Sequence, residues 1–152
     1  MIKKIDITNP KLAKDVLNIQ LPSYMVEAEL IHFYEIPPLK DTVDTLQQSG
    51  ETFYGYYLND ELSGVISIKV KKGVIDIHRL MVHPTHFRKG ISKMLLEFIE
   101  NNEEDIETII VSTGSKNTPA INFYKKNGFS ITGETNVTER LSVTSFNKKI
   151  KY

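Results

Sequence analysis

The hydrophobic positions of the first 50 residues change period at each proline. Apolar residues alternate with polar ones over Ile2–Ile7, which predicts a strand. Helical spacing follows over Pro10–Leu21, and Pro22 predicts a break before a second helix that reaches about Phe33. Pro37-Pro38 ends that pattern, and residues 41–48 predict one more short helix.

The middle of the chain is rich in β-branched and aromatic residues. It predicts three successive strands over Thr52–Leu58, Leu62–Val70 and Val74–Val82, joined by turns at Asn59-Asp60 and at 71–73. Because such short turns reverse the chain, we expect these strands to be antiparallel.

The helical period returns after the third of these strands. Apolar residues recur at i, i+3, i+4, i+7 and i+8 on one face of a predicted helix over 88–101. The remaining predicted elements are a strand at 108–111, a helix from about Thr118 that this residue caps, and strands near 129–134 and 140–150. This order predicts an α+β fold, with a mixed, mostly antiparallel central sheet flanked by helices and one parallel strand–helix–strand crossover.

Composition narrows the class of protein. With 152 residues and 40% hydrophobic residues, the chain is expected to form a single domain over 1–152. The 19 basic residues equal the 19 acidic ones, so we expect no general nucleic-acid binding. Cysteine is absent, which excludes disulfides, thiolate metal sites and a cysteine nucleophile. No signal-like or bilayer-length apolar stretch occurs, so we expect a cytoplasmic protein without a membrane role.

Candidate chemistry begins where the third strand of the middle region ends. The segment from Val82 passes through His83-Pro84 to a helix that starts near Gly90, with Arg88 and Lys89 before it. The first-turn N–H groups of a helix lack helical partners and attract anions. The segment therefore predicts a phosphate site, although an ordinary helix start with solvated cations has the same features.

A second segment, 117–129, predicts a compact helix with clear ends. Pro119 suits its first turn and Gly128 its stop. Ala120 and Tyr124 lie one turn apart on the same face, with Phe123 beside them. The small side chain of Ala120 leaves room for a thin ligand, although Tyr124 alone also fits a simple packing role.

As a pair, the two segments resemble the GNAT superfamily of acetyl-CoA-dependent N-acetyltransferases. The motifs are Val82-His-Pro-x-x-x-x-Lys-Gly90-Ile-Ser and Asn117-x-x-Ala-x-x-Phe-Tyr124-x-x-x-Gly-Phe. The family loop, Gln/Arg-x-x-Gly-x-Gly/Ala, falls on Phe87, Gly90 and Ser92, so only the central glycine matches the family residue. The resemblance implies the GNAT fold and acetyl-CoA as co-substrate.

The resemblance also implies which residues hold the cofactor. The phosphate loop and helix start correspond to the family's diphosphate site, the end of the preceding strand to its pantetheine site, and the second helix to its cofactor-facing helix. These cofactor-binding candidates are Met81, Val82, Phe87, Arg88, Lys89, Gly90, Ile91, Ser92, Asn117, Ala120, Phe123 and Tyr124.

The implied reaction is transfer of the acetyl group to a primary amine of a small molecule, a peptide or a protein. Without cysteine, direct attack in a ternary complex is favoured over an acyl-enzyme. Tyr124 is the candidate general acid for the leaving thiolate, and N–H groups around Met81 are candidates for the oxyanion. Glu27 and Glu29 are candidate bases, although both also fit a solvated helix face.

Three alternatives remain at this point, and one of them is transfer of a longer acyl chain such as propionyl or succinyl. Because Phe87 and Ser92 differ from the residues of the family loop, the sequence also fits a catalytically weak acyl-CoA-binding or sensor module of the same fold. A metal site is not expected, because His78 and His83 have no complete ligand set nearby. A homodimer is possible through an edge supplied by the late strands at 140–150.

Overall fold

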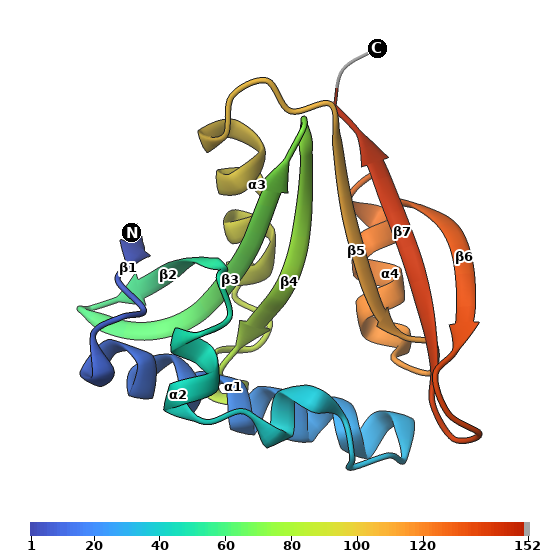
Figure 1. Ribbon diagram of the computed structural model, residues 1–152, viewed down its shortest axis with the longest axis horizontal. Helices are drawn as coiled ribbons and strands as arrows, with labels where there is room; N and C mark the ends of the chain where they lie inside the picture. Colours follow the sequence, from blue (N-terminus) through green and yellow to red (C-terminus); the bar gives the residue numbers. More distant parts are fainter. Residues whose placement is uncertain (151–152) are drawn as a thin grey trace.

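The computed structural model describes residues 1–150, which form one seven-stranded sheet with helices on both faces (Figure 1). The strand order is β1-β2-β3-β4-β5-β7-β6. The strands are β1 (Ile2–Ile5), β2 (Thr52–Leu58), β3 (Glu61–Lys71), β4 (Val74–Val82), β5 (Thr108–Gly114), β6 (Ser130–Asn136) and β7 (Ser142–Lys149). The helices are α1 (Pro10–Ile31), α2 (Val43–Gln47), α3 (Ile91–Asn102) and α4 (Thr118–Lys126), with 3-10 turns η1 (Pro37–Lys40) and η2 (Pro84–His86).

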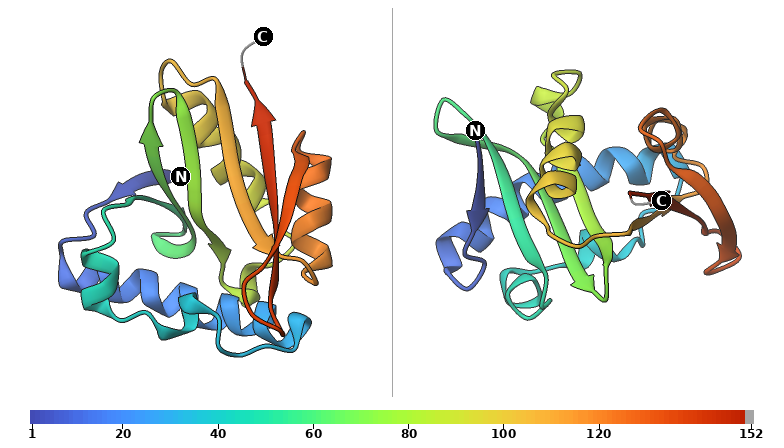
Figure 2. Two further views of the ribbon diagram at one scale, coloured as in Figure 1. Left: turned by 45° about the vertical axis from the view of Figure 1, so that its right-hand side comes forward. Right: turned by 90° about the horizontal axis from the view of Figure 1, so that it is seen from above.

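The alternation of side chains along the strands builds two apolar layers. In β2, Phe53 packs with α1 and α2 on one face, whereas Tyr54 packs with α3 and α4 on the other. In β3, Val65 and Ile66 divide in the same way. Figure 2 shows the helices on the two sides of the sheet when the molecule is seen from above. The predicted α+β sheet flanked by helices is confirmed.

The three central strands pair as expected from their turns. Asn59 and Asp60 both have positive φ, 49° and 65°, and Lys72 and Gly73 follow the same pattern with 51° and 81°. Two consecutive residues with positive φ form the tight hairpin turn that matches strand twist. β2, β3 and β4 are therefore antiparallel neighbours.

The predicted break at Pro22 is wrong, because α1 continues through this residue to Ile31. A proline inside a helix removes one hydrogen bond and costs about 3 kcal/mol. Buried residues lie on both sides of it, with Ile19 and Gln20 before the proline and Ala28 after it. Tertiary packing of the two flanking segments thus outweighs the local preference for a break.

The parallel crossover around α3 is confirmed, but its two strands soon separate. β4 and β5 pair at three positions only, from Val74 with Thr108 to Asp76 with Ile110. β5 then continues along β7 over all seven of its residues, whereas β4 stays with β3. In Figure 1 the two strands form a V that opens toward α1.

A bulge in β4 lies at the point where the strands separate. Ile68 of β3 pairs with Ile77 and Ser67 pairs with Arg79, so His78 is the extra residue. The bulge reverses which face each later side chain occupies. Ile77 packs on the α3 face, and Arg79 therefore points to the α1 face although it is two residues further along.

Two details at the C-terminal end differ from the predictions. Asn117, not Thr118, caps α4, because its side chain accepts the Ala120 N–H at 3.3 Å. The strand predicted at 140–150 is internal, since β7 lies between β5 and β6, and the sheet edge is β6. Within residues 1–150, no helix combines the length and apolar character needed to cross a membrane.

Candidate functional site

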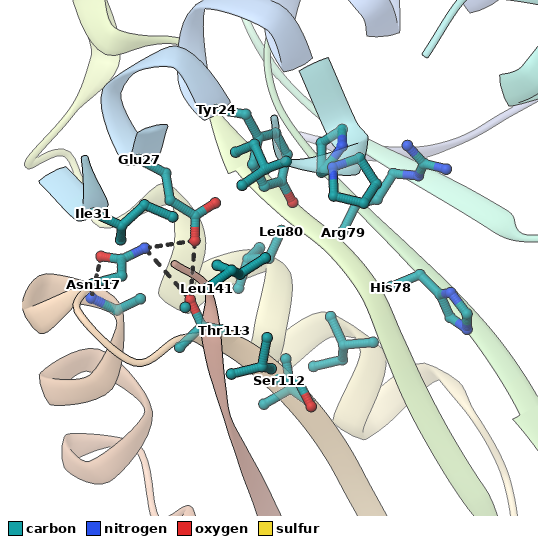
Figure 3. A pocket seen from close by; sticks show the side chains of 18 of the residues that line it. Tyr24, Glu27, Ile31, His78, Arg79, Leu80, Ser112, Thr113, Asn117 and Leu141 are labelled. Atoms are coloured by element: carbon teal, nitrogen blue, oxygen red, sulfur yellow. Dashed lines mark hydrogen bonds between the residues drawn. The ribbon is translucent and has the colours of Figure 1, made fainter. Parts of the chain in front are cut away.

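A cavity of about 230 Å³ lies between the separated ends of β4 and β5 (Figure 3). Its walls come from α1, η1, β4, β5, α4 and the start of β7, so distant parts of the sequence meet there. Tyr24, Glu27, His78, Arg79, Leu80, Thr113, Asn117, Ala120 and Tyr124 are among the residues that line it.

Glu27 is the carboxylate of α1 that lines this cavity. Its Oε1 accepts hydrogen bonds from Asn117 Nδ2 at 3.0 Å and from Thr113 Oγ1 at 3.2 Å. Figure 3 shows these bonds joining α1 to β5 and to the start of α4. The carboxylate is thereby fixed in orientation inside the cavity, which a solvated helix face would not require.

Glu29, the other candidate base, is exposed and does not line the cavity. Two residues along a helix turn the side chain by roughly 200°, so Glu27 and Glu29 point to opposite sides of α1. The structure therefore places one of the two predicted carboxylates at the site and leaves the other in solvent.

Tyr124 lines the same cavity from α4 and is 6% exposed. Its ring packs against Phe123, Phe129 and Phe146 at centroid distances of 5.3–5.4 Å. Burial, together with the nearby Tyr24 and Glu27, raises the pKa of Tyr124 well above its usual range. The phenol is thus protonated at neutral pH.

Tyr24 was not predicted from the sequence, although it lies one turn before Glu27 on the same helix face. Its hydroxyl lies near the backbone of Leu80 in β4 (Figure 3). Burial is the main reason that the pKa of Tyr24 is raised, and the neighbouring Glu27 raises it further. The i, i+3 spacing to Glu27 is a sequence signal that could have identified it.

The hydrogen-bond pattern of β4 determines which of its backbone N–H groups point away from β3. The N–H of His83 donates to the backbone oxygen of Ser63, near the start of β3, at 2.9 Å. Successive N–H groups point in alternate directions along a strand. The N–H groups of Leu80 and Val82 therefore point into the opening. That of Met81 points toward β3, and its side chain is buried against α1. The backbone N–H groups that this end of β4 directs into the opening are thus those of the residues on either side of Met81.

A side-chain network closes the α1 end of the cavity. Arg79 Nε and Nη2 donate to Glu51 at 2.8 and 3.2 Å, and Nη1 donates to Asp41 and, at 3.0 Å, to Gln20. Gln20, which is fully buried, also donates to Asp41 and to Pro38 O, both at 2.8 Å. One arginine thus ties α1 and η1 to β4.

The network has a marked effect on its ionisable groups. Burial alone would raise the pKa of Asp41 and of Glu51, but hydrogen bonds and the positive charge of Arg79 hold both below their usual values. Burial would likewise lower the pKa of Arg79, and these two carboxylates raise it instead. Two carboxylates therefore face one guanidinium and balance its charge.

The predicted phosphate loop has the conformation of an anion site. Arg88 and Gly90 have positive φ, 66° and 75°, and no side chain caps the first turn of α3. A Cβ at Gly90 would meet nothing within 4 Å, so the backbone is open to a ligand. Two left-handed residues before an uncapped helix turn backbone N–H groups to one side. These residues fit the diphosphate of a nucleotide cofactor.

Some of the other cofactor-binding candidates near this loop are buried and others are exposed. Ile91 is buried under the sheet and anchors the helix start, and Val82 is buried at the end of β4. Phe87, at 43% exposed, lies on the surface with Arg88 and Lys89. The two cations stand beside the open helix start, whereas Phe87 brings no polar group to it.

The histidines are dispersed. His78 Nε2 lies 3.3 Å from Asp76 Oδ2, while His83 hydrogen-bonds to the adjacent Thr85. Among residues 1–150, no three His, Asp or Glu side chains are grouped so as to hold a metal ion.

Comparison with known proteins gives one family and several relatives. Residues 13–129 match the Acetyltransferase (GNAT) family. The UPF0157 protein YqkA of Bacillus subtilis is 42% identical over 129 residues, which cover 85% of this chain but 38% of that protein. The chain thus spans well under half the length of this relative.

Two further proteins are similar over most of their length. Streptothricin acetyltransferase of Escherichia coli is 26% identical over 133 residues, or 85% of this chain and 75% of that protein. The structure of the paia N-acetyltransferase of Thermoplasma acidophilum with coenzyme A superimposes with a TM-score of 0.78 at 20% identity, covering 98% of each chain. At that identity, the superposition shows a common fold.

Proposed function

Because this chain belongs to the acetyltransferase (GNAT) family, we propose that it is an N-acetyltransferase that moves the acetyl group of acetyl-CoA to a primary amine. The observation that carries the proposal is the cavity itself. It brings Glu27 of α1 and Tyr124 of α4 together in the opening between β4 and β5. A carboxylate and a protonated phenol facing one space are the two groups that an amine-to-thioester transfer requires.

Acetyl-CoA fits the backbone features at the other end of the opening. Its diphosphate suits the loop of Arg88 and Gly90 with the uncapped start of α3. Its pantetheine arm suits the N–H groups of Leu80 and Val82, which point into the opening. Small Ala120 keeps the facing side of α4 open. Bound there, the cofactor supplies an activated thioester. The T. acidophilum relative, solved with coenzyme A, supports this assignment.

The amine enters from the side of α1 and η1. A primary amine arrives as a cation at neutral pH. Glu27 lines the cavity and its carboxylate is held by the neutral side chains of Asn117 and Thr113, so it is suited to bind that cation and to take its proton. Arg79 does not oppose this, because Glu51 and Asp41 balance its charge. The streptothricin acetyltransferase similarity favours a small-molecule acceptor.

The transfer balances with these two residues. The amine nitrogen attacks the acetyl carbon directly, and the carbon–sulfur bond breaks. Glu27 takes the first proton of the ammonium group, which frees the nitrogen lone pair, and releases it to solvent. The second proton leaves nitrogen after the carbon–nitrogen bond forms, and it replaces the proton that Tyr124 gives to the thiolate. Direct attack in a ternary complex is favoured because the chain has no cysteine to form an acyl-enzyme.

The Tyr124→Phe variant tests this proposal. Turnover should fall by about 10²- to 10⁴-fold, because a positioned acid contributes roughly that much, whereas acetyl-CoA affinity should stay near that of the wild type. Release of CoA thiol with a panel of amines measures the first and calorimetry the second. Tyr34→Phe is the matched control, because Tyr34 is 55% exposed and outside the cavity.

Two results would contradict the proposal. Equal turnover in Tyr124→Phe would remove this residue as the acid. Tight acetyl-CoA binding by the wild type without thiol release for any amine would instead favour the acyl-CoA sensor.

A further inference from the structure

The two oxygens of the Glu27 carboxylate have different surroundings. Oε1 accepts both hydrogen bonds that reach this side chain, from Asn117 Nδ2 at 3.0 Å and from Thr113 Oγ1 at 3.2 Å. Within residues 1–150, no protein donor is hydrogen-bonded to Oε2. Figure 3 shows this second oxygen directed away from Asn117, toward the side on which Tyr24 lies. The carboxylate is therefore held at one oxygen, and the other faces the cavity.

Asn117 uses both ends of its side-chain amide. The oxygen accepts the Ala120 N–H at 3.3 Å and so caps α4, while the nitrogen donates to Glu27. Only this orientation of the amide satisfies both partners, because a carboxylate accepts and an N–H donates. Tyr124 follows about two turns further along α4. One side chain thus connects the helix of the proposed acid to the carboxylate of the proposed base.

The backbone around Asn117 is itself fixed. The N–H of Asn117 donates to the backbone oxygen of Gly114 at 2.9 Å, which closes a turn at the end of β5. The turn is joined to β7, since the N–H of Ser115 donates to the backbone oxygen of Ser142 at 2.8 Å. Ile31 of α1 packs so near that a Cβ at Gly114 would lie 3.4 Å from its Cγ2. Asn117 is therefore held where α1, β5 and α4 meet.

We propose that Asn117 is a positioning residue of the transfer, which holds Glu27 Oε1 so that Oε2 faces the incoming ammonium group. This inference rests on the proposed function and deepens it, because Asn117 acts on the reaction through Glu27. A carboxylate already held at one oxygen loses less side-chain freedom when the cation binds. A neutral amide also holds it without adding a positive charge that would repel the amine. This role differs from the cofactor contact that the family resemblance implies for Asn117.

Asn117→Ser tests the role, because serine caps a helix about as well as asparagine but is too short to reach Glu27. We expect kcat to fall by about 10- to 100-fold, since a small misplacement of a reacting group has an effect of that size. The melting temperature and the acetyl-CoA affinity should stay near those of the wild type. Thiol release, thermal denaturation and calorimetry measure the three quantities.

Asn9→Ser is the matched control. Asn9 caps α1 in the same way, since its side chain accepts the Lys11 N–H at 2.9 Å, but it is exposed and lies outside the cavity. The exchange of asparagine for serine at a helix cap should therefore leave kcat unchanged there. An equal fall of kcat in both variants would assign the effect to capping and overturn the inference.

The same exchange in a Glu27→Gln background shows whether Asn117 acts through the carboxylate. There Asn117→Ser should lower kcat by less than about twofold, because the group that it positions is already gone. A fall as large as in the wild-type background would contradict the inference. A loss of acetyl-CoA affinity at unchanged kcat would also overturn it, because it would place Asn117 at the cofactor.

A further measurement does not need turnover. The two side-chain amide protons of Asn117, assigned by their absence in Asn117→Ser, should give well separated ¹H–¹⁵N signals, because the hydrogen bond to Glu27 shifts one of them downfield. In Glu27→Ala this separation should shrink. Unchanged signals would overturn the inference even in an active enzyme. If no amine is acetylated, the proposed function fails, and the amide signals still decide whether Asn117 holds Glu27.

Discussion

Two regions of the proposed site are built in different ways. The loop around Arg88 and Gly90, which we call the cofactor end, presents backbone N–H groups, and its side chains are largely exposed. The network centred on Arg79, which we call the acceptor end, is formed by side chains from α1, the η1 region, β4 and Glu51 just before β2. The first end depends on backbone conformation, and the second depends on partners far apart in the sequence.

This difference teaches how each end tolerates change. A backbone site loses little when an exposed side chain is replaced, so the departure of exposed Phe87 from the family pattern should matter less than a change at Gly90 would. A buried charge network loses much when one member is removed, because the remaining charges stay buried without partners. The acceptor end should therefore be the more fragile part of the molecule.

The largest expected effect comes from Arg79→Met. It leaves Glu51, whose side chain is 6% exposed, facing Asp41 without a counter-charge, and this should lower the free energy of unfolding by about 3–5 kcal/mol. Urea denaturation measures the loss. Lys11→Met is the control, because Lys11 pairs with Asp15 at 3.8 Å with an 83% exposed side chain, and such surface pairs contribute little. Equal losses in both variants would abolish the contrast between network and surface.

A smaller effect is expected from acid. Arg79 holds the pKa of Asp41 and of Glu51 below their unfolded values. Their contribution to stability is therefore complete above the ordinary carboxyl pKa, near about pH 4. It is lost as the pH falls through the lowered pKa values of the folded state. Denaturation at a series of pH values should show this fall. Glu51→Gln should reduce its slope. A wild-type stability that stays constant from pH 6 to pH 3 would contradict it.

The same contrast explains what the sequence could and could not predict. The loop at Gly90 and the helix of Tyr124 are each local, so their residues stand close together in the chain and form a recognisable pattern. Tyr24 and Arg79 acquire meaning only through partners that the fold brings to them, such as Leu80 and Glu51. No spacing along the chain indicates those partners.

The fold follows the same division. Short turns such as Asn59-Asp60 determine the hairpins locally, and these were predicted. The continuation of α1 through Pro22 was not, because it depends on tertiary packing of both halves of the helix. The bulge at His78 was also missed, since only the pairing of β4 with β3 shows the extra residue.

The smallest expected effect is also the most selective, and it concerns Gly90. Gly90→Ala places a side chain at φ +75°, where non-glycine residues cost roughly 1–2 kcal/mol, without any clash within 4 Å. Gly50→Ala introduces the same strain at φ +74°, with its nearest atom, Lys69 Cε, at 3.8 Å. Both variants should lose similar stability by urea denaturation.

Binding should separate these two glycines. Only Gly90 lies where a ligand's phosphate is expected to approach the backbone, so acetyl-CoA affinity measured by calorimetry should fall in Gly90→Ala and stay at the wild-type level in Gly50→Ala. Because the two substitutions impose the same strain, that difference would isolate close approach of the ligand from loss of stability. Equal affinities in the two variants would mean that the cofactor end does not depend on backbone access at Gly90. The distinction between the two ends of the proposed site would then rest on Arg79 alone.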